Sequence, residues 1–358
     1  MPITDFLVAR DDIARTKTAA REFPVLGDGE VLLELERFGL SANNITYATL
    51  GDAMGYWRFF PAEEGWGSVP VWGHAHVVGS HCAGIEPGMR YFGYYPLSTH
   101  LVVKPERVTP NGFVDGAAHR AELPAVYQRY MLVPEDSEVG GNAEDQQSLW
   151  RPLFLTSFGA ADFIEENGAF EAGVVVFTSA SSKTALGTAF CLNRIAGALE
   201  LVGLTSAANV EFCESTDYYD RVVSYDDLSA IGEKPFILID FAGNGAVLDA
   251  IEEFAGDRLL RTIIVGGTHW EDRERSLTAM SAGTELFFLP TWIVKRSEDW
   301  GPTSFMERGE AEWEVFAPTT ETWLTLEEHT GLEGIENAYQ LVLAGESRPD
   351  VGHILEFG

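Results

Sequence analysis

One segment in the middle of the chain constrains the fold more than any other. Residues 173–205 read GVVVFTSASSKTALGTAFCLNRIAGALELVGLT: an apolar run, a turn of small residues, a longer stretch and a second apolar run. Ala185, Ala189 and Leu192 recur at helical spacing, so 183–198 is predicted to be a helix with one apolar face. A strand, a helix and a second strand in this order are typical of neighbouring parallel strands in one sheet.

The same alternation continues on both sides of this segment. Helices are predicted over 156–167 and 246–254, and strands over the apolar runs 221–224, 236–241, 261–265 and 285–289. Strands that are apolar along their whole length are typical of a parallel sheet covered by helices on both faces. The middle of the chain is therefore predicted to be an α/β domain with a doubly wound parallel sheet.

The two ends of the chain have a different pattern. Residues 30–38 alternate apolar and polar side chains, as a half-buried strand does, and 69–80 and 99–103 are similar. The aromatic segment 47–70, which glycines interrupt, is predicted to be a long loop, and the acidic segment 134–147 an exposed one. The tail is predicted to form a strand, a helix and a strand, over 321–327, 333–344 and 353–357.

The charge of the chain limits its partners. It carries 55 acidic against 24 basic residues, a net charge of -31, and a surface of that sign repels nucleic acid and anionic lipid. No apolar run approaches the roughly 20 residues of a membrane helix. The first residues lack the features of a secretion signal. We therefore expect a cytoplasmic protein without a nucleic-acid or membrane partner.

Cysteine is scarce in this sequence. The three cysteines, Cys82, Cys191 and Cys213, include no C-x-x-C pair. They cannot form the disulfide framework of a small secreted domain, nor supply the four thiolates of a typical structural zinc site.

The turn after the first predicted strand is the candidate cofactor site. Parallel sheets bind ligands beyond the carboxyl ends of their strands, where a helix N-terminus offers amides and a positive dipole end to a phosphate. The turn lacks the pattern G-x-G-x-x-G, but it is small, rich in hydroxyls and carries one cation. Two interpretations remain open, a pyrophosphate site or a serine-capped helix without ligand. The residues concerned are Ser179, Ser181, Ser182, Lys183 and Thr184.

The end of the second strand favours NADP(H) over NAD. No carboxylate follows that strand, and Thr205 and Ser206 offer hydroxyls where a 2′-phosphate would lie. Arg221 is a candidate for the charge of that phosphate, together with the lysine of the first turn. Glycines after the later strands either admit the nicotinamide ribose or form ordinary turns; they are Gly243, Gly266 and Gly267.

Taken in order, these segments resemble the medium-chain dehydrogenase/reductase superfamily, in particular its zinc-independent, quinone-oxidoreductase-like branch. The resemblance is carried by 29–47, 71–93, 179–187 and 331–357. It implies a GroES-like β domain formed by both chain ends, 1–155 and 318–358, around a Rossmann-type nucleotide-binding domain, 156–317. It also implies an NADP(H)-dependent enzyme that reduces an activated C=C, quinone or carbonyl, and a homodimer joined through the sheet edge at 285–289.

The chain departs from the zinc-dependent relatives at the positions of their ligands. Ser41 stands where those relatives have a cysteine, and His74 is followed by alanine instead of an acidic residue. No cysteine lies near 150–160. The resemblance therefore implies hydride transfer without zinc. The glycines of the family's phosphate turn are also replaced, by Ser179, Ser182 and Ala185.

The resemblance places the candidate catalytic residues in the loop that faces the active site in relatives. Tyr47 is the first candidate for a proton donor, with Asn44 and Ser41 orienting the substrate and Tyr56 in reserve. Loop packing is the alternative for Tyr47. A group of nearby aromatic residues either lines a pocket for an apolar substrate or forms a small core of its own: Trp57, Phe59, Phe60 and Trp66.

Two further groups of residues each have two possible interpretations. A set of histidines with one cysteine is interpreted as core histidines with satisfied hydrogen bonds, in preference to a metal site: His74, His76, His81, Cys82 and His100. Four residues of the segment 111–150 either contact an acidic substrate or a partner subunit, or lie on the surface without such a role: Arg120, Tyr127, Arg129 and Tyr130. The rival to the reductase as a whole is a non-catalytic dinucleotide-binding or sensor protein that retains the fold.

Overall fold

The computed structural model describes residues 2–135, 137, 139–195, 199–265 and 283–358. The chain divides into two compact units, Met1–Trp150 with Thr325–Gly358, and Arg151–Leu324. The first unit is thus built from both ends of the chain and the second from its middle. The boundaries lie after residues 150 and 324, whereas the sequence predicts them after residues 155 and 317.

The unit Arg151–Leu324 is built on a six-stranded sheet whose neighbouring strands are all parallel. In spatial order the strands are β13 (Arg221–Ser224), β12 (Glu200–Thr205), β11 (Val174–Phe177), β14 (Phe236–Asp240), β15 (Leu259–Ile264) and β16 (Thr284–Leu286). The chain starts in the middle, winds outward through β12 and β13, and then crosses to β14. The strand order therefore reverses between β11 and β14, which is where sheets of this kind bind ligands.

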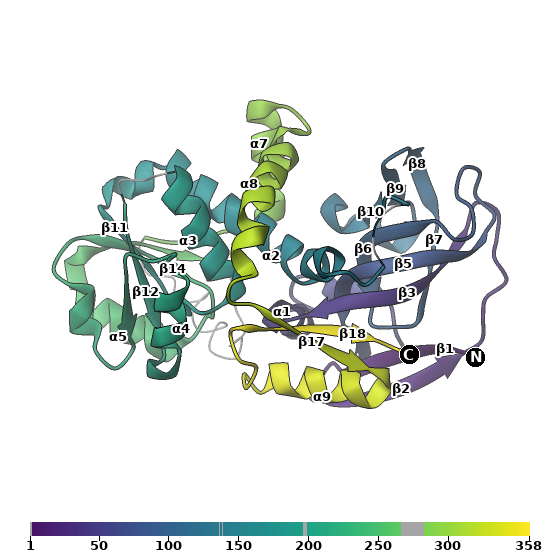
Figure 1. Cartoon of the computed structure of the whole chain (residues 1–358), viewed down its shortest axis with the longest axis horizontal. Helices are drawn as coiled ribbons and strands as arrows, with labels where there is room; N and C mark the ends of the chain where they lie inside the picture. Colours follow the sequence, from purple (N-terminus) through teal and green to yellow (C-terminus); the bar gives the residue numbers. More distant parts are fainter. Residues whose placement is uncertain (1, 136, 138, 196–198, 266–282) are drawn as a thin grey trace. The chain divides into compact units, whose positions relative to one another are not determined.

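Helices lie on both faces of this sheet (Figure 1). They are α2 (Asn142–Glu166), which begins in the other unit, α3 (Lys183–Ile195), α4 (Val210–Ser215), α5 (Gly245–Ala255), α7 (Leu289–Trp300) and α8 (Ser304–Thr320). Single 3-10 turns are η4 (Gly168–Glu171), η5 (Ala207–Asn209), η6 (Leu228–Ile231) and η7 (Gly256–Arg258). Over the described residues, none of the helices has the length and apolar character that spanning a bilayer requires.

Two predicted boundaries in this region are wrong. The segment 134–147 was expected to be a loop, but α2 begins at Asn142, because Glu144 and Asp145 favour the positive end of a helix and are held by arginines. The last strand was expected over 285–289, but β16 ends at Leu286 and α7 starts with a proline in its first turn. Proline suits a helix start and cannot donate within a strand.

The other unit contains a nine-stranded mixed sheet and a three-stranded antiparallel sheet. The larger sheet runs β17 (Thr325–Thr330), β18 (Val351–Glu356), β3 (Val31–Leu40), β5 (Pro70–Ser80), β6 (Arg90–Pro96), β10 (Arg129–Leu132), β9 (Gly112–Asp115) and β8 (Pro105–Thr109), with β7 (His100–Val103) also paired to β3. The smaller one runs β2 (Asp12–Arg21), β1 (Ile3–Ala9) and β4 (Trp66–Ser68). Helices α1 (Ala42–Thr49) and α9 (Gly331–Leu343) and the turns η1 (Tyr56–Arg58), η2 (Ala118–Arg120) and η3 (Ala125–Gln128) complete it.

The C-terminal tail is an integral part of this unit. Strand β18 pairs antiparallel with β3, so that His353 lies opposite Leu40, and parallel with β17 on its other side. Helix α9 connects these two strands and buries Ile335 and Tyr339 in the core that the N-terminal strands also line. Both ends of the chain therefore share one core, as the sequence predicts.

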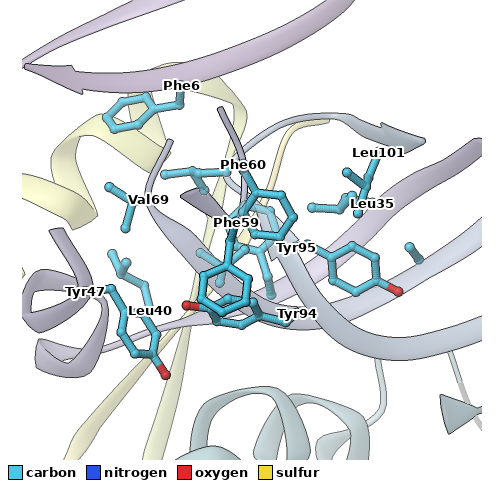
Figure 2. Packing of buried hydrophobic residues seen from close by; sticks show 14 of the residues in the cluster. Phe6, Leu35, Leu40, Tyr47, Phe59, Phe60, Val69, Tyr94, Tyr95 and Leu101 are labelled. Carbon is cyan, nitrogen blue, oxygen red and sulfur yellow. The ribbon is translucent and has the colours of Figure 1, made fainter. Parts of the chain in front are cut away.

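The segment 47–70 is not the loop that its glycines suggest. It contains the end of α1, the turn η1 and strand β4, all packed on an aromatic core (Figure 2). A Cβ atom on Gly51 would lie 2.0 Å from the Trp57 ring, and one on Gly67 would lie 2.5 Å from it. These glycines therefore make room for a buried indole instead of breaking the structure.

A buried ion pair supports the outer strands of the same unit. Nη1 of Arg120 lies 2.7 Å from Oδ2 of Asp115, and both side chains are almost completely buried. The other carboxylate oxygen of Asp115 accepts the backbone N–H groups of Lys104 and Ala117. Arg120 and Tyr130 are thus part of the core, and the alternatives of a substrate contact or a surface position are both wrong for them.

Removal of the guanidinium leaves a buried carboxylate without its cation. We expect Arg120→Met to lower the free energy of unfolding by about 3–5 kcal/mol. In the double variant Arg120→Met/Asp115→Asn, the remaining amide oxygen still accepts the two backbone N–H groups, so most of that loss should be recovered. Urea unfolding of the wild type, both single variants and the double variant measures the coupling. Additive effects of the two substitutions would contradict this account.

Candidate functional site

The turn after β11 keeps a backbone shape that normally requires glycine. Ser179 has φ of 47°, in the left-handed region that non-glycine residues rarely adopt. Its N–H donates to the hydroxyl of Tyr225 at 2.7 Å, and the hydroxyl of Tyr219 donates to the carbonyl of Ala180 at 2.8 Å. Two tyrosines from the neighbouring β13 region therefore hold this turn from outside.

Helix α3 starts directly after that turn. The Ser182 hydroxyl accepts the N–H of Ala185 at 3.3 Å, so Ser182 caps the helix, and Lys183 and Thr184 form its first turn. This N-terminus lies at the carboxyl end of β11, with its dipole directed at the edge of the sheet. A Cβ atom on Gly187 would lie 2.7 Å from Oγ of Ser157, so this glycine allows α2 and α3 to approach closely.

The end of β12 contributes a second group of hydroxyls. Oγ1 of Thr205 lies 3.4 Å from Oγ of Ser181, and the amide of Asn209 donates to that serine hydroxyl at 3.1 Å. Ser206 follows and is exposed. The structure therefore brings together Ser181, Thr205 and Ser206 as predicted neighbours. The sequence did not predict Asn209 as part of this group, because no motif links it to the end of β12.

The end of β14 completes this edge. The buried carboxylate of Asp240 accepts the hydroxyl of Thr178 at 2.5 Å and the N–H of Gly243 at 2.8 Å. Gly243 has φ of 70°, and Asn244 caps α5 through the N–H of Val247. Sequence reasoning missed Asp240, although a single acid at the end of the apolar run FILID is a recognisable signal of a buried polar role.

Arg221, which the sequence predicts as a cation of this site, lies at the opposite edge of the sheet. Arg221 is the first residue of β13, paired with Val202, whereas Ser224 at the other end of the strand pairs with Thr205. Its guanidinium donates to Glu200 at 2.7 Å and to the carbonyl of Ile231 at 2.7 Å. Because parallel strands begin at the opposite edge from their carboxyl ends, Arg221 cannot join the turns described above. Gly266 and Gly267 lie outside the described residues.

In the other unit, two of the candidate catalytic residues form a helix cap. The Ser41 hydroxyl accepts the N–H of Asn43, and the Asn44 side chain accepts the N–H of Ser41, which together make a capping box for α1. Asn44 also donates to the carbonyl of Pro70 at 2.9 Å. These contacts give Ser41 and Asn44 a structural role, and their role toward a substrate stays a prediction.

Tyr47 lies among aromatic rings. Its ring centroid is 5.6 Å from that of Tyr94, and Figure 2 labels both residues. The Tyr47 centroid is also 4.7 Å from that of Tyr56, and Trp72 donates its indole N–H to the Tyr47 hydroxyl at 3.4 Å. Burial raises the pKa of Tyr47 well above its ordinary value, so the hydroxyl keeps its proton. Tyr127 packs on Tyr94 with centroids 4.8 Å apart.

The predicted substrate-binding aromatics occupy different environments. Trp57, Phe59 and Phe60 are buried members of the core of this unit. Trp66 is half-buried on β4, where Nζ of Lys17 lies 3.9 Å from the centre of its ring. The first three residues are therefore placed as core side chains. A direct contact of any of them with substrate stays a prediction.

His74 uses both of its ring nitrogens within the protein. Nδ1 lies 3.1 Å from the hydroxyl of Ser148, and Nε2 lies 3.1 Å from the side-chain oxygen of Gln147. Burial lowers the pKa of His74, so the ring is neutral. His76 contacts the carboxylate of Glu36 at 3.0 Å. Both ring nitrogens of His74 thus have polar partners within the protein, as the interpretation of a core histidine expects.

The fold is similar to that of several solved structures. CurA from Vibrio vulnificus in complex with NADPH is 12% identical, with a TM-score of 0.64 over 99% of each chain. TarJ from S. aureus in complex with NADPH is 10% identical, with a TM-score of 0.59 over 99% of each chain. The complex of Etr1p with NADP and crotonyl-CoA is 11% identical, with a TM-score of 0.57 over 100% of each chain.

This likeness defines the class of fold. The chain has a Rossmann-type parallel sheet and a GroES-like β unit, and the predicted fold class is confirmed. Within it, residues 38–348 match the family described as Protein of unknown function (DUF2855), and the chain belongs to this family. No curated protein is similar enough in sequence to be matched.

The left-handed conformation of Ser179 provides a test of the turn. A Cβ in this region costs about 1–2 kcal/mol, and glycine in the unfolded chain costs roughly 0.5–1 kcal/mol in entropy. We therefore expect Ser179→Gly to leave the free energy of unfolding unchanged or raise it by up to about 1 kcal/mol. Ser179→Val should lower it by about 1–2 kcal/mol. Urea unfolding checks both variants, and a valine variant as stable as the glycine variant would refute the turn's conformation.

Proposed function

We propose that this chain is an NADP(H)-dependent oxidoreductase that reduces an activated C=C, quinone or carbonyl substrate without zinc. One observation carries the proposal. At the point where the strand order reverses, a left-handed turn leads into a helix N-terminus, and the neighbouring strand ends in hydroxyls without a carboxylate. Such an edge suits a phosphorylated dinucleotide.

The residues of this edge fit NADP(H). The amides at the start of α3, with the ammonium group of Lys183, would hold the pyrophosphate, and Thr205 and Ser206 would hold the 2′-phosphate. The side chains in the turn are small, as close approach of a phosphate requires. The likeness to CurA and TarJ supports this assignment, since both were solved with NADPH. Bound NADPH supplies the hydride, and the chain supplies position and electrostatic stabilisation.

Hydride transfer without zinc is part of this proposal, and the residues at the positions of the zinc ligands in the family that the sequence resembles support it. Ser41 is engaged in the cap of α1, and both nitrogens of His74 are occupied by Ser148 and Gln147. A serine hydroxyl and an occupied imidazole do not replace a thiolate and a free imidazole. The carbonyl or quinone oxygen would then be stabilised by hydrogen bonds, for which the hydroxyls of Tyr47 and Tyr56 are the candidates.

A second candidate function has an observation in its favour. Tyr47 and the aromatic side chains of Trp57, Phe59 and Phe60 are buried in packing contacts. A protein that binds the dinucleotide without turnover would need no reactive hydroxyl and no substrate pocket. We therefore keep a non-catalytic dinucleotide-binding or sensor protein as the alternative.

We further infer a homodimer joined through β16. This strand is the last of the parallel sheet in the part of the chain that the structure describes, and Leu286 on it is exposed. The edge of a sheet that carries an exposed apolar side chain is suited to association with the same edge of a second copy. Sedimentation velocity of the wild type, set against Leu286→Lys, measures whether this edge associates.

The first functional experiment tests the charge of the 2′-phosphate site. Ser206→Asp places a carboxylate at the end of β12, so NADPH binding should weaken about tenfold or more, which corresponds to ~1.4 kcal/mol. NADH binding should change much less. Ser206→Asn is the matched control, because it has similar size without charge. Fluorescence titration of all three proteins measures both dissociation constants, and equal losses for NADPH and NADH would contradict the assignment of Thr205 and Ser206.

The second experiment separates the enzyme from the sensor. NADPH consumption is followed with quinones and enones, for the wild type and for Tyr47→Phe. If Tyr47 donates a proton, turnover should fall by about 10²-fold while NADPH affinity is kept. Tyr339→Phe is the control, because it removes the hydroxyl of another buried tyrosine, which donates to the carbonyl of Ile13. NADPH binding without consumption of any acceptor would favour the sensor, and the absence of NADPH binding would overturn both functions.

A further inference from the structure

We propose that Glu327, His329 and His353 form a binding site for a divalent transition metal, with zinc as the ion that fits best. The site lies on the strand pair β17–β18 at the C-terminal end of the chain, in the unit Met1–Trp150 with Thr325–Gly358. It is separate from the candidate dinucleotide site and from the histidine group of His74, His76, His81 and His100. It does not depend on the proposed function.

The register of two parallel strands brings these side chains together. Glu327 lies directly opposite His353, and His329 follows Glu327 by two positions on the same strand. Side chains two apart on a strand share one face of the sheet, and paired positions on neighbouring strands share it too. One ligand atom from each of the three residues lies within 4.8 Å of the others.

The two imidazole rings are already close to the separation that a shared metal needs. Nε2 of His329 lies 3.0 Å from Nδ1 of His353. Zinc–nitrogen bonds of about 2.0–2.1 Å in a tetrahedral arrangement place two ligating nitrogens roughly 3.3 Å apart. A metal can therefore replace the proton between the rings after a shift of a few tenths of an ångström. The exposed carboxylate of Glu327 can turn toward the ion from the solvent side.

A hydrogen bond with Ser347 affects which nitrogen of the buried His353 ring carries the proton. The Ser347 hydroxyl lies 2.8 Å from Nε2 of His353. When that nitrogen carries the proton and donates to Ser347, the lone pair of Nδ1 is directed at His329, as metal-binding histidines require. His353 is buried, His329 half-buried and Glu327 exposed. The three side chains would thus hold the ion on the sheet, and its fourth coordination position would be open to solvent.

The ligand types and the charge select the metal. Two imidazoles with one carboxylate suit zinc and similar ions, whereas calcium and magnesium prefer oxygen ligands alone. The charge of Arg348 interacts with Glu327, and Arg348 is itself paired with Asp350. The net charge of -31 gives the chain a long-range attraction for cations.

Metal binding to the full chain tests this site. After dialysis against EDTA, the protein is titrated with zinc chloride in competition with a chromogenic chelator. We expect one equivalent of zinc per chain in the wild type and a loss of at least about 100-fold in affinity in His329→Ala. Ser347→Ala should lower affinity by about 10–100-fold, because it removes the hydrogen bond that orients His353.

Two control variants separate this site from other histidines. His81→Ala removes an exposed histidine, and His76→Ala removes one that contacts Glu34 and Glu36; both should bind zinc like the wild type. Circular dichroism confirms that each variant is folded. Cobalt bound in place of zinc should show visible absorption bands that disappear in His329→Ala. Absence of zinc binding by the folded wild type, equal affinity in His329→Ala, or loss of binding in His76→Ala instead, would overturn the proposal, whatever the outcome with NADPH.

Discussion

The buried carboxylate of Asp240 holds together the two turns on which the candidate dinucleotide site depends. It accepts the hydroxyl of Thr178 at the end of β11 and the N–H of Gly243 after β14. A carboxylate this deeply buried is tolerated only when its oxygens are well supplied with donors. Hydrogen bonds to this one carboxylate therefore connect the ends of β11 and β14, the two strands between which the strand order reverses. With Tyr225 and Tyr219 bonded to the next two residues, the turn keeps its shape without the usual glycines.

Basic residues are scarce in this chain, and several of the buried carboxylates have to share them. With 24 basic residues for 55 acidic ones, single arginines bridge several carboxylates. Arg37 contacts Asp145, Glu328 and Glu356, which joins β3 to the start of α2 and to both C-terminal strands. Arg90 contacts Glu36 and Glu144, and Arg296 contacts Asp162, Glu166 and Asp299. Because each guanidinium offers five donors, such networks satisfy buried acids that one-to-one pairs could not.

Several polar side chains that the sequence suggests for chemistry have structural contacts in this fold. Ser41 and Asn44 form a helix cap, and the ring nitrogens of His74 contact Gln147 and Ser148 from α2. The candidate dinucleotide site, by contrast, presents hydroxyls and a helix N-terminus. At 10–12% identity to the solved structures, the fold is shared while the chemistry of each site has to be argued from its own residues.

The sequence by itself determined the parallel sheet and the β-rich character of the two chain ends, because the burial of strands and helices follows from local periodicity. The single unit formed by both ends was implied by the family resemblance. Only the tertiary structure decided which end of β13 carries Arg221, that Gly51 and Gly67 accommodate Trp57, and that α2 starts at Asn142. It also brought His329 and His353 together, 24 residues apart. Strand register and the pairing of distant charges depend on contacts between segments, and no local pattern of residues encodes them.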